Sequence, residues 1–456
     1  MLARKIMPQV LLNGDHREID FSPAWENLIR LSPHIISIVR ACLALFGGAM
    51  FRPAARLRVS ALRLWGALAF IALPHLARSA ETGYFPAPEK QGGWRSLVAA
   101  NQRATARQKT AVADKAGIDW DKLSEAWTYC ESLRGRHSLL VIRHGWIAGE
   151  WHNFTAPLGI ASCTKSIAAL SIARLCELSD RGLTKQKIGL DDFAWRYLPA
   201  SWSEAEPARK KIQLRHLLTM TSGLTPHNGP YTREYASVLF AQTVEAPPGT
   251  VWAYSSAPVD MLSYIVEAVS GRRMGDFFNE EIGARIGAVP AFFPPISGKG
   301  GKPTEPSGGS GGPGGGARFT ARELARVGYL LLHDGAWGNG GASQQLIGAA
   351  RVREFTQDVP GLKRATFREP NFARIVNSNR SYGHLFWTNS TQEPLGAAVP
   401  RDTFFMWGWG KQICAVIPSL DLVVVRLGPE AALNDRPDFY AQLFSRIMAA
   451  MVPAAP

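Results

Sequence analysis

The sequence predicts a mixed α/β fold in which one sheet is built from both ends of the chain and a large helical region lies between them. Strand-like runs rich in β-branched and aromatic residues occur at residues 138–151 and again at 403–427. The residues between these runs have mainly helical patterns separated by loops. The chain has 456 residues, of which 46% are hydrophobic, so it can bury a large core and is not a disordered chain.

The first half of the domain contains the hairpin and the most apolar helix. In chain order we predict a polar lead-in over residues 81–120, a helix over 119–133, a β-hairpin over 138–151 and a helix over 166–178. The last of these is apolar on almost every side, which is typical of a buried helix rather than an amphipathic surface helix. Gly182 is expected to end it.

The second half is helical up to about residue 355 and then returns to strands. Residues 298–316 contain ten glycines and three prolines, a composition that cannot pack a core and predicts a flexible loop. The remaining elements are strands predicted over 403–407, 412–418 and 422–427 and a closing helix over 439–451. We therefore expect a leader over residues 1–79 and one domain over residues 80–456, whose helical region covers about 160–400.

The leader is interpreted as containing a secretory signal peptide at about residues 50–79. A basic region without acids precedes the unbroken apolar run Leu64–Leu73, and small residues suitable for cleavage follow near Ala80. Ten apolar residues are too few to span a bilayer, so no stable membrane span is expected after cleavage. This pattern predicts a periplasmic or secreted protein. The alternative is a buried or membrane-anchoring helix over residues 64–76.

The formal net charge of +14 does not indicate a nucleic-acid partner. Ten of the 51 basic residues lie in residues 1–79, and the rest of the chain has no block of five or six like charges. The five cysteines are scattered, and the nearest pair, Cys163 and Cys176, is 13 residues apart. This spacing predicts no zinc cluster, and no metal or organic cofactor is expected.

A candidate nucleophile and base lie at the start of the apolar helix. Ser162 and Lys165 form a Ser-x-x-Lys pattern, and residues i and i+3 share one face of a helix. A serine hydroxyl becomes an effective nucleophile when a base takes its proton, and a lysine can be that base when burial lowers its pKa. The Ser162 N–H at a helix start can also bind an oxyanion. The alternative is an N-capping serine with a solvated lysine.

A second motif follows 92 residues downstream, where the turn Pro247-Pro248-Gly249 leads to Tyr254-Ser255-Ser256. Two further segments complete the pattern, at residues 213–224 and 320–332. With these motifs in this order, the chain resembles the serine β-lactamase and penicillin-binding-protein superfamily over about residues 84–451. It is most similar to the branch of class C β-lactamase-related esterases and amidases, which includes 6-aminohexanoate-dimer hydrolases.

This resemblance implies a β-lactamase/transpeptidase-like fold, with an antiparallel sheet flanked by helices. It also implies that Tyr254 shares proton transfer with Lys165 after Ser162 attacks a carbonyl group. The expected activity is that of a serine hydrolase acting through an acyl-enzyme on a small-molecule carboxylic ester or amide. The alternatives are a β-lactamase or D,D-peptidase, or a ligand-binding relative without catalytic activity.

Two departures from the family pattern bear on the substrate. Ser256 replaces the usual asparagine, and its hydroxyl is shorter and lacks the paired donor and acceptor of an amide. Met406-Trp407-Gly408 stands in place of Lys-Thr-Gly, which removes a cation that would hold a carboxylate. In this register these residues line the substrate site, and the Trp409 N–H completes the oxyanion hole. The alternative for both tryptophans is ordinary aromatic packing on a strand.

Overall fold

The fold is given by a computed structural model, which describes residues 83–133, 135–152, 156–228, 239–293, 316–338, 344–364, 366–367, 381–428 and 436–452. Within the chain, Glu81–Pro456 forms one compact unit. The predicted leader over residues 1–79 and residues 298–315 of the predicted glycine-rich loop lie outside the described residues. In the part of the chain that is described, no helix is long and apolar enough to cross a membrane.

The central element is a six-stranded antiparallel sheet with the strand order β10-β11-β12-β13-β1-β2. Its strands are β1 (Ser138–Arg143), β2 (Trp146–Trp151), β10 (Trp387–Thr388), β11 (Phe404–Gly408), β12 (Gln412–Ile417) and β13 (Leu422–Leu427). The two ends of the domain meet where β1 pairs with β13, so that Val141 lies opposite Val424. The predicted α/β class, with a sheet built from both ends, is therefore confirmed.

Helices are the other main elements of the unit. In chain order they are α4 (Ala106–Ala116), α5 (Trp120–Glu131), α6 (Cys163–Asp180), α7 (Ala200–Ala205), α8 (Leu214–Leu218), α10 (Ala257–Ser270), α11 (Met274–Phe278), α12 (Ala284–Ile286), α13 (Ala321–Leu332), α14 (Ala349–Thr356) and α15 (Phe439–Ala449). The predicted helices over 119–133, 166–178 and 439–451 correspond to α5, α6 and α15. Helix α6 is buried along nearly its whole length, and Gly182, with a left-handed φ of 69°, follows its end.

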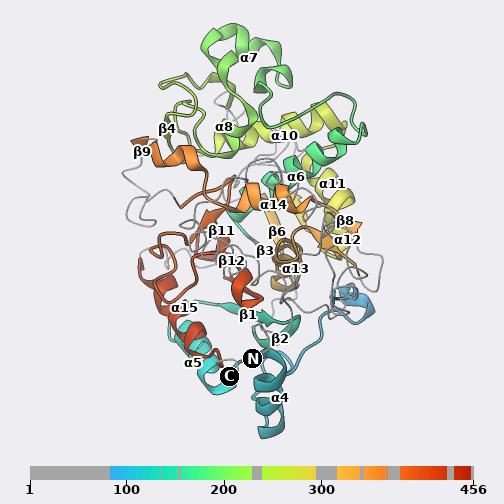
Figure 1. Cartoon of the computed structure of the whole chain (residues 1–456), viewed down its shortest axis with the longest axis vertical. Helices are drawn as coiled ribbons and strands as arrows, with labels where there is room; N and C mark the ends of the chain where they lie inside the picture. The colour runs from blue at the N-terminus through green and yellow to red at the C-terminus, as the bar shows by residue number, and fades with distance from the viewer. Residues whose placement is uncertain are drawn as a thin grey trace, which may run out of the picture. The chain divides into compact units, whose positions relative to one another are not determined.

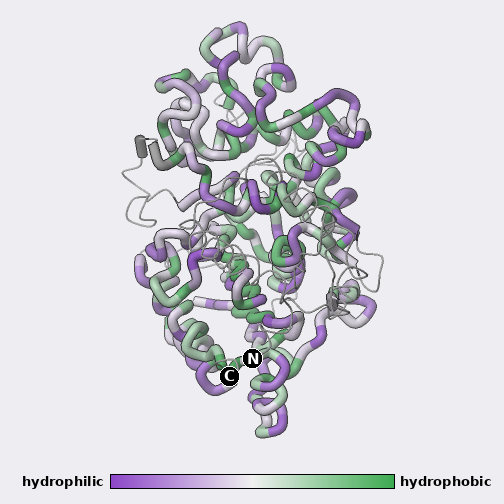
Figure 2. The backbone as a smooth tube through the Cα atoms, viewed as in Figure 1, coloured by the Kyte–Doolittle hydropathy of each residue, from purple (hydrophilic) through white to green (hydrophobic). Residues whose placement is uncertain are grey.

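The helices are distributed unevenly around the sheet. Figure 1 shows α7, α8 and α10 gathered at one end of the unit, whereas β1, β2, α5 and α15 lie at the other. Helix α4 is largely hydrophilic (Figure 2), and only its Val112 and Ala116 are buried. This contrast with α6 shows which helices form the core and which lie at its surface.

Helices cover both faces of the sheet because its strands are apolar on both sides. On one face α13 approaches so closely that a Cβ at Gly328 would lie 2.8 Å from Cys414 Sγ and 3.0 Å from Val423 Cγ1. Side chains alternate along a strand, so Arg426 of β13 points to the opposite face. There its guanidinium lies 5.4 Å from the centroid of the Phe439 ring of α15. Helix α5 packs beside α15.

The predicted helical region also contains short strands that the sequence did not predict. They are β3 (Leu158–Gly159), β4 (Val251–Trp252), β5 (Ala291–Phe293), β6 (Gly316–Phe319), β7 (Ala336–Trp337), β8 (Gln344–Gln345) and β9 (Thr366–Phe367). Strands β3, β6 and β5 form a three-stranded sheet, which continues toward α6 through a hydrogen bond from Ile160 N to the Ala317 carbonyl. Strands of two to four residues are too short to show a clear alternation.

A buried ion pair joins α13 to β2. The Glu150 side chain is 2% exposed and accepts two hydrogen bonds from Arg322, at 2.8 Å and 2.6 Å. Removal of the arginine leaves a buried carboxylate without this partner, so Arg322→Met is expected to lower the free energy of unfolding by about 3 kcal/mol in chemical denaturation. The control, Arg196→Met, removes an exposed pair with Asp192 and should cost less than about 1 kcal/mol. An equally small effect at Arg322 would contradict the prediction.

Candidate active site

Ser162 lies immediately before the first residue of α6. The preceding residue, Ala161, has a left-handed backbone conformation with φ of 49°, which marks a sharp turn into the helix. The Ser162 side chain makes no capping hydrogen bond to α6. Its Oγ lies 3.2 Å from the Nζ of Lys165. The Ser162 hydroxyl therefore lies beside the Lys165 amine and does not act as an N-cap, which was the alternative.

The side chain of Lys165, which belongs to α6, is covered by the residues that precede α10. It is 2% exposed. The Nζ atom is 3.1 Å from Ser256 Oγ and 5.0 Å from the centroid of the Tyr254 ring. Because α6 packs against α10, two motifs that are far apart in the sequence meet at this amine.

Burial changes the acid–base chemistry of Lys165. Desolvation lowers the pKa of its amine from 10.5 to about 7, and the nearby Asp260 and Cys163 oppose this shift. An amine with a pKa near 7 is neutral in a large fraction of molecules at physiological pH. A neutral amine can accept the proton of a serine hydroxyl, which a solvated lysine cannot do at the same pH.

Tyr254 is held against Lys165 by a cluster of aromatic rings. It is 3% exposed, and its ring stacks on Trp387 with a centroid separation of 6.0 Å and an interplanar angle of 21°. Trp252 and Tyr382 pack edge-on around the same Trp387 ring. The position of the phenol relative to the amine is therefore set by packing.

Ser256 lies inside the site rather than at an open surface. It is 2% exposed, and its Oγ contacts Lys165 on one side and donates to Asn228 Oδ1, 3.2 Å away, on the other. The Asn228 side chain also accepts from Ser256 N and donates to the Tyr254 carbonyl. Sequence reasoning missed Asn228, because it belongs to no recognisable motif.

A second residue that sequence reasoning missed is Asp260. It lies in the first turn of α10, is 2% exposed, and donates its backbone N–H to the Ser256 carbonyl. Its carboxylate interacts electrostatically with Lys165. The sequence did contain a signal, since Asp260 lies between the apolar pairs 258–259 and 261–262, and an acid in such a run generally has a charged or polar partner.

The end of strand β11 lies against the backbone of Ser162. A Cβ at Gly408 would collide with the Ile160 carbonyl oxygen and lie 3.2 Å from Ser162 N. The two tryptophans beside this glycine differ. Trp407 is buried and packs edge-on against Trp387, with a centroid separation of 5.6 Å, as expected for ordinary aromatic packing on a strand. Trp409, directly after the strand, is 56% exposed.

The His216 side chain of α8 is held by a hydrogen bond at the start of its own helix. His216 Nδ1 accepts a hydrogen bond from Gln213 N, and burial lowers the pKa of this histidine to about 4, so the ring is neutral. Among the described residues, no group of three or more His, Cys, Asp or Glu side chains is arranged to hold a metal ion.

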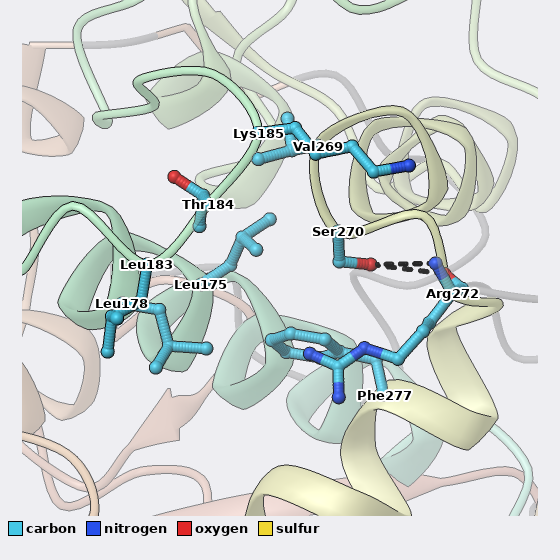
Figure 3. A pocket seen from close by; sticks show the side chains of 9 residues that line it. All are labelled: Leu175, Leu178, Leu183, Thr184, Lys185, Val269, Ser270, Arg272 and Phe277. Carbon is cyan, nitrogen blue, oxygen red and sulfur yellow. Dashed lines mark hydrogen bonds between the residues drawn. The ribbon is translucent and has the colours of Figure 1, made fainter.

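A small cavity of about 70 Å³ lies at the far ends of the two helices that form the site (Figure 3). It is lined by Leu175 and Leu178 of α6, by Val269 and Ser270 of α10, and by residues 183–185, Arg272 and Phe277. Ser162 and Ser256 lie at the opposite, N-terminal ends. At 1.5 Å per residue, this separation along α6 is roughly 20 Å, so the cavity is not part of the site.

A family model described as Beta-lactamase matches residues 138–436, well over half of this chain. The chain belongs to this β-lactamase family. The match begins at β1 and continues beyond β13, so it includes every residue placed in the site above. Membership of the superfamily, which the motifs predicted, is confirmed.

Similar proteins include enzymes of more than one activity. Monacolin J acid methylbutanoyltransferase of Aspergillus terreus is 30% identical over 164 residues, which are 30% of this chain and 38% of that protein. A Bacillus anthracis structure assigned as a 6-aminohexanoate-dimer hydrolase is 16% identical, with a TM-score of 0.53 over 80% of this chain and 89% of that one. A family VIII carboxylesterase structure is 16% identical, with a TM-score of 0.52 over 73% and 96%. At these identities the structures share the β-lactamase fold with this chain.

The close approach of β11 to Ser162 predicts that Gly408 cannot carry a side chain. If Ser162 is the reactive serine, Gly408→Ala should push the strand end away from it and lower the rate of its labelling by a fluorophosphonate at least about a hundredfold. Gly159→Ala is the matched control, because a Cβ there meets nothing within 4 Å. Equal labelling rates in the two variants would show that the strand end does not position Ser162.

Proposed function

We propose that this β-lactamase-family chain is a serine hydrolase that acts through an acyl-enzyme on a carboxylic ester or amide of a small molecule. The observation that carries the proposal is the buried Lys165 amine 3.2 Å from Ser162 Oγ. With a pKa of about 7, this amine is suited to take a proton from a serine near neutral pH. Fold neighbours assigned as a dimer hydrolase and a carboxylesterase support the same class.

In the proposed acylation step, neutral Lys165 takes the hydroxyl proton while Ser162 Oγ bonds to the substrate carbonyl carbon. The carbonyl oxygen becomes negative and is bound by the Ser162 N–H and by the Trp409 N–H at the end of β11. Each such donor contributes about 3 kcal/mol in comparable sites. The carbonyl then reforms, the bond to the leaving group breaks, and the alcohol or amine receives a proton from Lys165 or Tyr254.

The proposed deacylation step repeats this chemistry with water. Lys165 or Tyr254 takes a proton from water, the hydroxide oxygen bonds to the acyl carbon, and the same two N–H groups bind the oxyanion. The bond to Ser162 Oγ then breaks, Oγ regains a proton, and a carboxylic acid leaves. The Aspergillus terreus relative is named as an acyl transferase, which fits an acyl-serine intermediate.

An ester is proposed in preference to a β-lactam because the site offers few polar groups for a carboxylate-bearing ring. The position of the family lysine holds Met406, which is 1% exposed. The Ser256 hydroxyl is already occupied by Lys165 and Asn228. The alternatives are a β-lactamase or D,D-peptidase and a ligand-binding relative without catalysis.

We also propose, from the leader interpreted in the sequence, that the enzyme acts in the periplasm or outside the cell on a small-molecule substrate. No nucleic-acid partner is part of this proposal.

The purified full-length protein is expected to hydrolyse short-chain p-nitrophenyl esters and to be labelled by a fluorophosphonate at Ser162. Ser162→Ala should abolish the labelling and lower kcat at least about a thousandfold, with an unchanged melting temperature. For the native enzyme, kcat/KM for the ester should exceed that for a nitrocefin-type β-lactam by at least about a hundredfold.

Two outcomes would contradict this proposal in different ways. Opening of the β-lactam as fast as the ester would identify a β-lactamase or peptidase. Absence of both turnover and labelling in the native protein would identify a ligand-binding relative.

The lowered pKa of Lys165 predicts a pH dependence. Below about pH 7 the amine is protonated and cannot accept the Ser162 proton, so kcat/KM should fall about tenfold per pH unit on the acid side and level off above. Because the Asp260 carboxylate favours the charged amine, Asp260→Asn should move the inflection to lower pH. Asp276→Asn, an exposed acid on α11, is the control and should not move it. A wild-type inflection near pH 4, as for a carboxylate base, would contradict the assignment of Lys165.

A further inference from the structure

Asn228 makes hydrogen bonds to both ends of the Tyr254–Ser256 tripeptide. Its Oδ1 accepts from the Ser256 backbone N–H at 2.9 Å and from Ser256 Oγ at 3.2 Å, and its Nδ2 donates to the Tyr254 carbonyl at 2.8 Å. A backbone N–H can only donate and a carbonyl can only accept, so these partners determine which end of the amide is the oxygen.

The orientation of this amide determines the direction of the Ser256 hydroxyl. Ser256 Oγ has one hydrogen, and Asn228 Oδ1 can only accept, so this hydrogen points to Asn228. The lone pairs of Oγ then face Lys165 Nζ, 3.1 Å away, which donates to them. Donation therefore runs from Lys165 to Ser256 and from Ser256 to Asn228.

This direction of donation determines whether the Lys165 lone pair is available to accept a hydrogen from Ser162. A neutral amine has two hydrogens and one lone pair. With one hydrogen given to Ser256, the lone pair can point toward Ser162 Oγ, 3.2 Å away, and accept its proton. Without Asn228, the Ser256 hydroxyl could turn and donate to the same lone pair, which would compete with Ser162.

We propose that Asn228 is a positioning residue that orients Lys165, through Ser256, for proton abstraction from Ser162. This inference rests on the proposed acyl-enzyme function. The backbone around Asn228 has its own attachments, because Ser256 N–H donates to the His227 carbonyl at 3.0 Å and His227 N–H donates to Ser255 Oγ at 2.9 Å. Substitution of Asn228 should therefore remove the side-chain contacts and leave the segment in place.

A double-mutant cycle tests the proposal. Asn228→Ala and Ser256→Ala should each lower kcat for a p-nitrophenyl ester, and the rate of fluorophosphonate labelling, by about 10- to 100-fold with little change in KM. Because Asn228 acts through Ser256, the double variant should be no slower than the slower single variant. A purely structural role would instead lower the melting temperature and leave kcat per folded molecule unchanged.

Thr225→Val is the matched control. Its hydroxyl bonds to Thr243 Oγ1 at 2.9 Å and so attaches the same segment three residues away, without contact to the motif. This variant should retain native kcat. Wild-type kcat in Asn228→Ala, or a double variant whose loss is the product of the two single losses, would overturn the role of Asn228. Absence of labelling in the native protein would overturn the proposed function instead, and this inference with it.

Discussion

The burial of one amine, that of Lys165, is the constraint on which the rest of the site depends. A charged ammonium that is 2% exposed is costly, so burial favours the neutral form and lowers the pKa to about 7. The buried amine still needs hydrogen-bond partners. The Ser162 and Ser256 hydroxyl oxygens supply them, at 3.2 Å and 3.1 Å from Nζ. The same contacts that make the burial tolerable therefore place a largely neutral amine beside a serine hydroxyl, as the proposed mechanism requires.

The fold brings the starts of α6 and α10 to this amine and the end of β11 to Ser162. The pairing of β1 with β13 joins the two ends of the domain in one sheet. In this sheet the end of β11 lies against the Ser162 backbone at Gly408. A sheet shared by both ends could be predicted, because strand patterns occur at both ends of the domain and the residues between them are mainly helical. The short strands β3, β5 and β6 could not, since their pairing depends on tertiary contacts rather than on alternation.

The site residues that could be found from the sequence are those that belong to a short motif. Ser162 and Lys165 are one helical turn apart, and the resemblance to the β-lactamase superfamily joined this pair to Tyr254, so the three could be named without a structure. Asn228 could not, because a polar residue in a loop has no periodic signal and its contacts arise only after folding. Asp260 lies between these cases: an acid within an apolar helix predicts a buried partner but does not identify it.

The hydrogen bonds of Ser256 also limit what this residue can do for a substrate. Its one hydrogen is directed to Asn228, and its lone pairs face Lys165, so no donor is left for a substrate carbonyl. Ser256, which was expected from the sequence to contact substrate, instead holds Lys165 in the proposed mechanism. In the proposed function, recognition then comes from the Ser162 and Trp409 N–H groups and from apolar surface, such as the exposed Trp409. The site proposed here therefore suits an acyl group that presents one polar carbonyl, and it penalises a substrate whose further polar groups would be buried without partners.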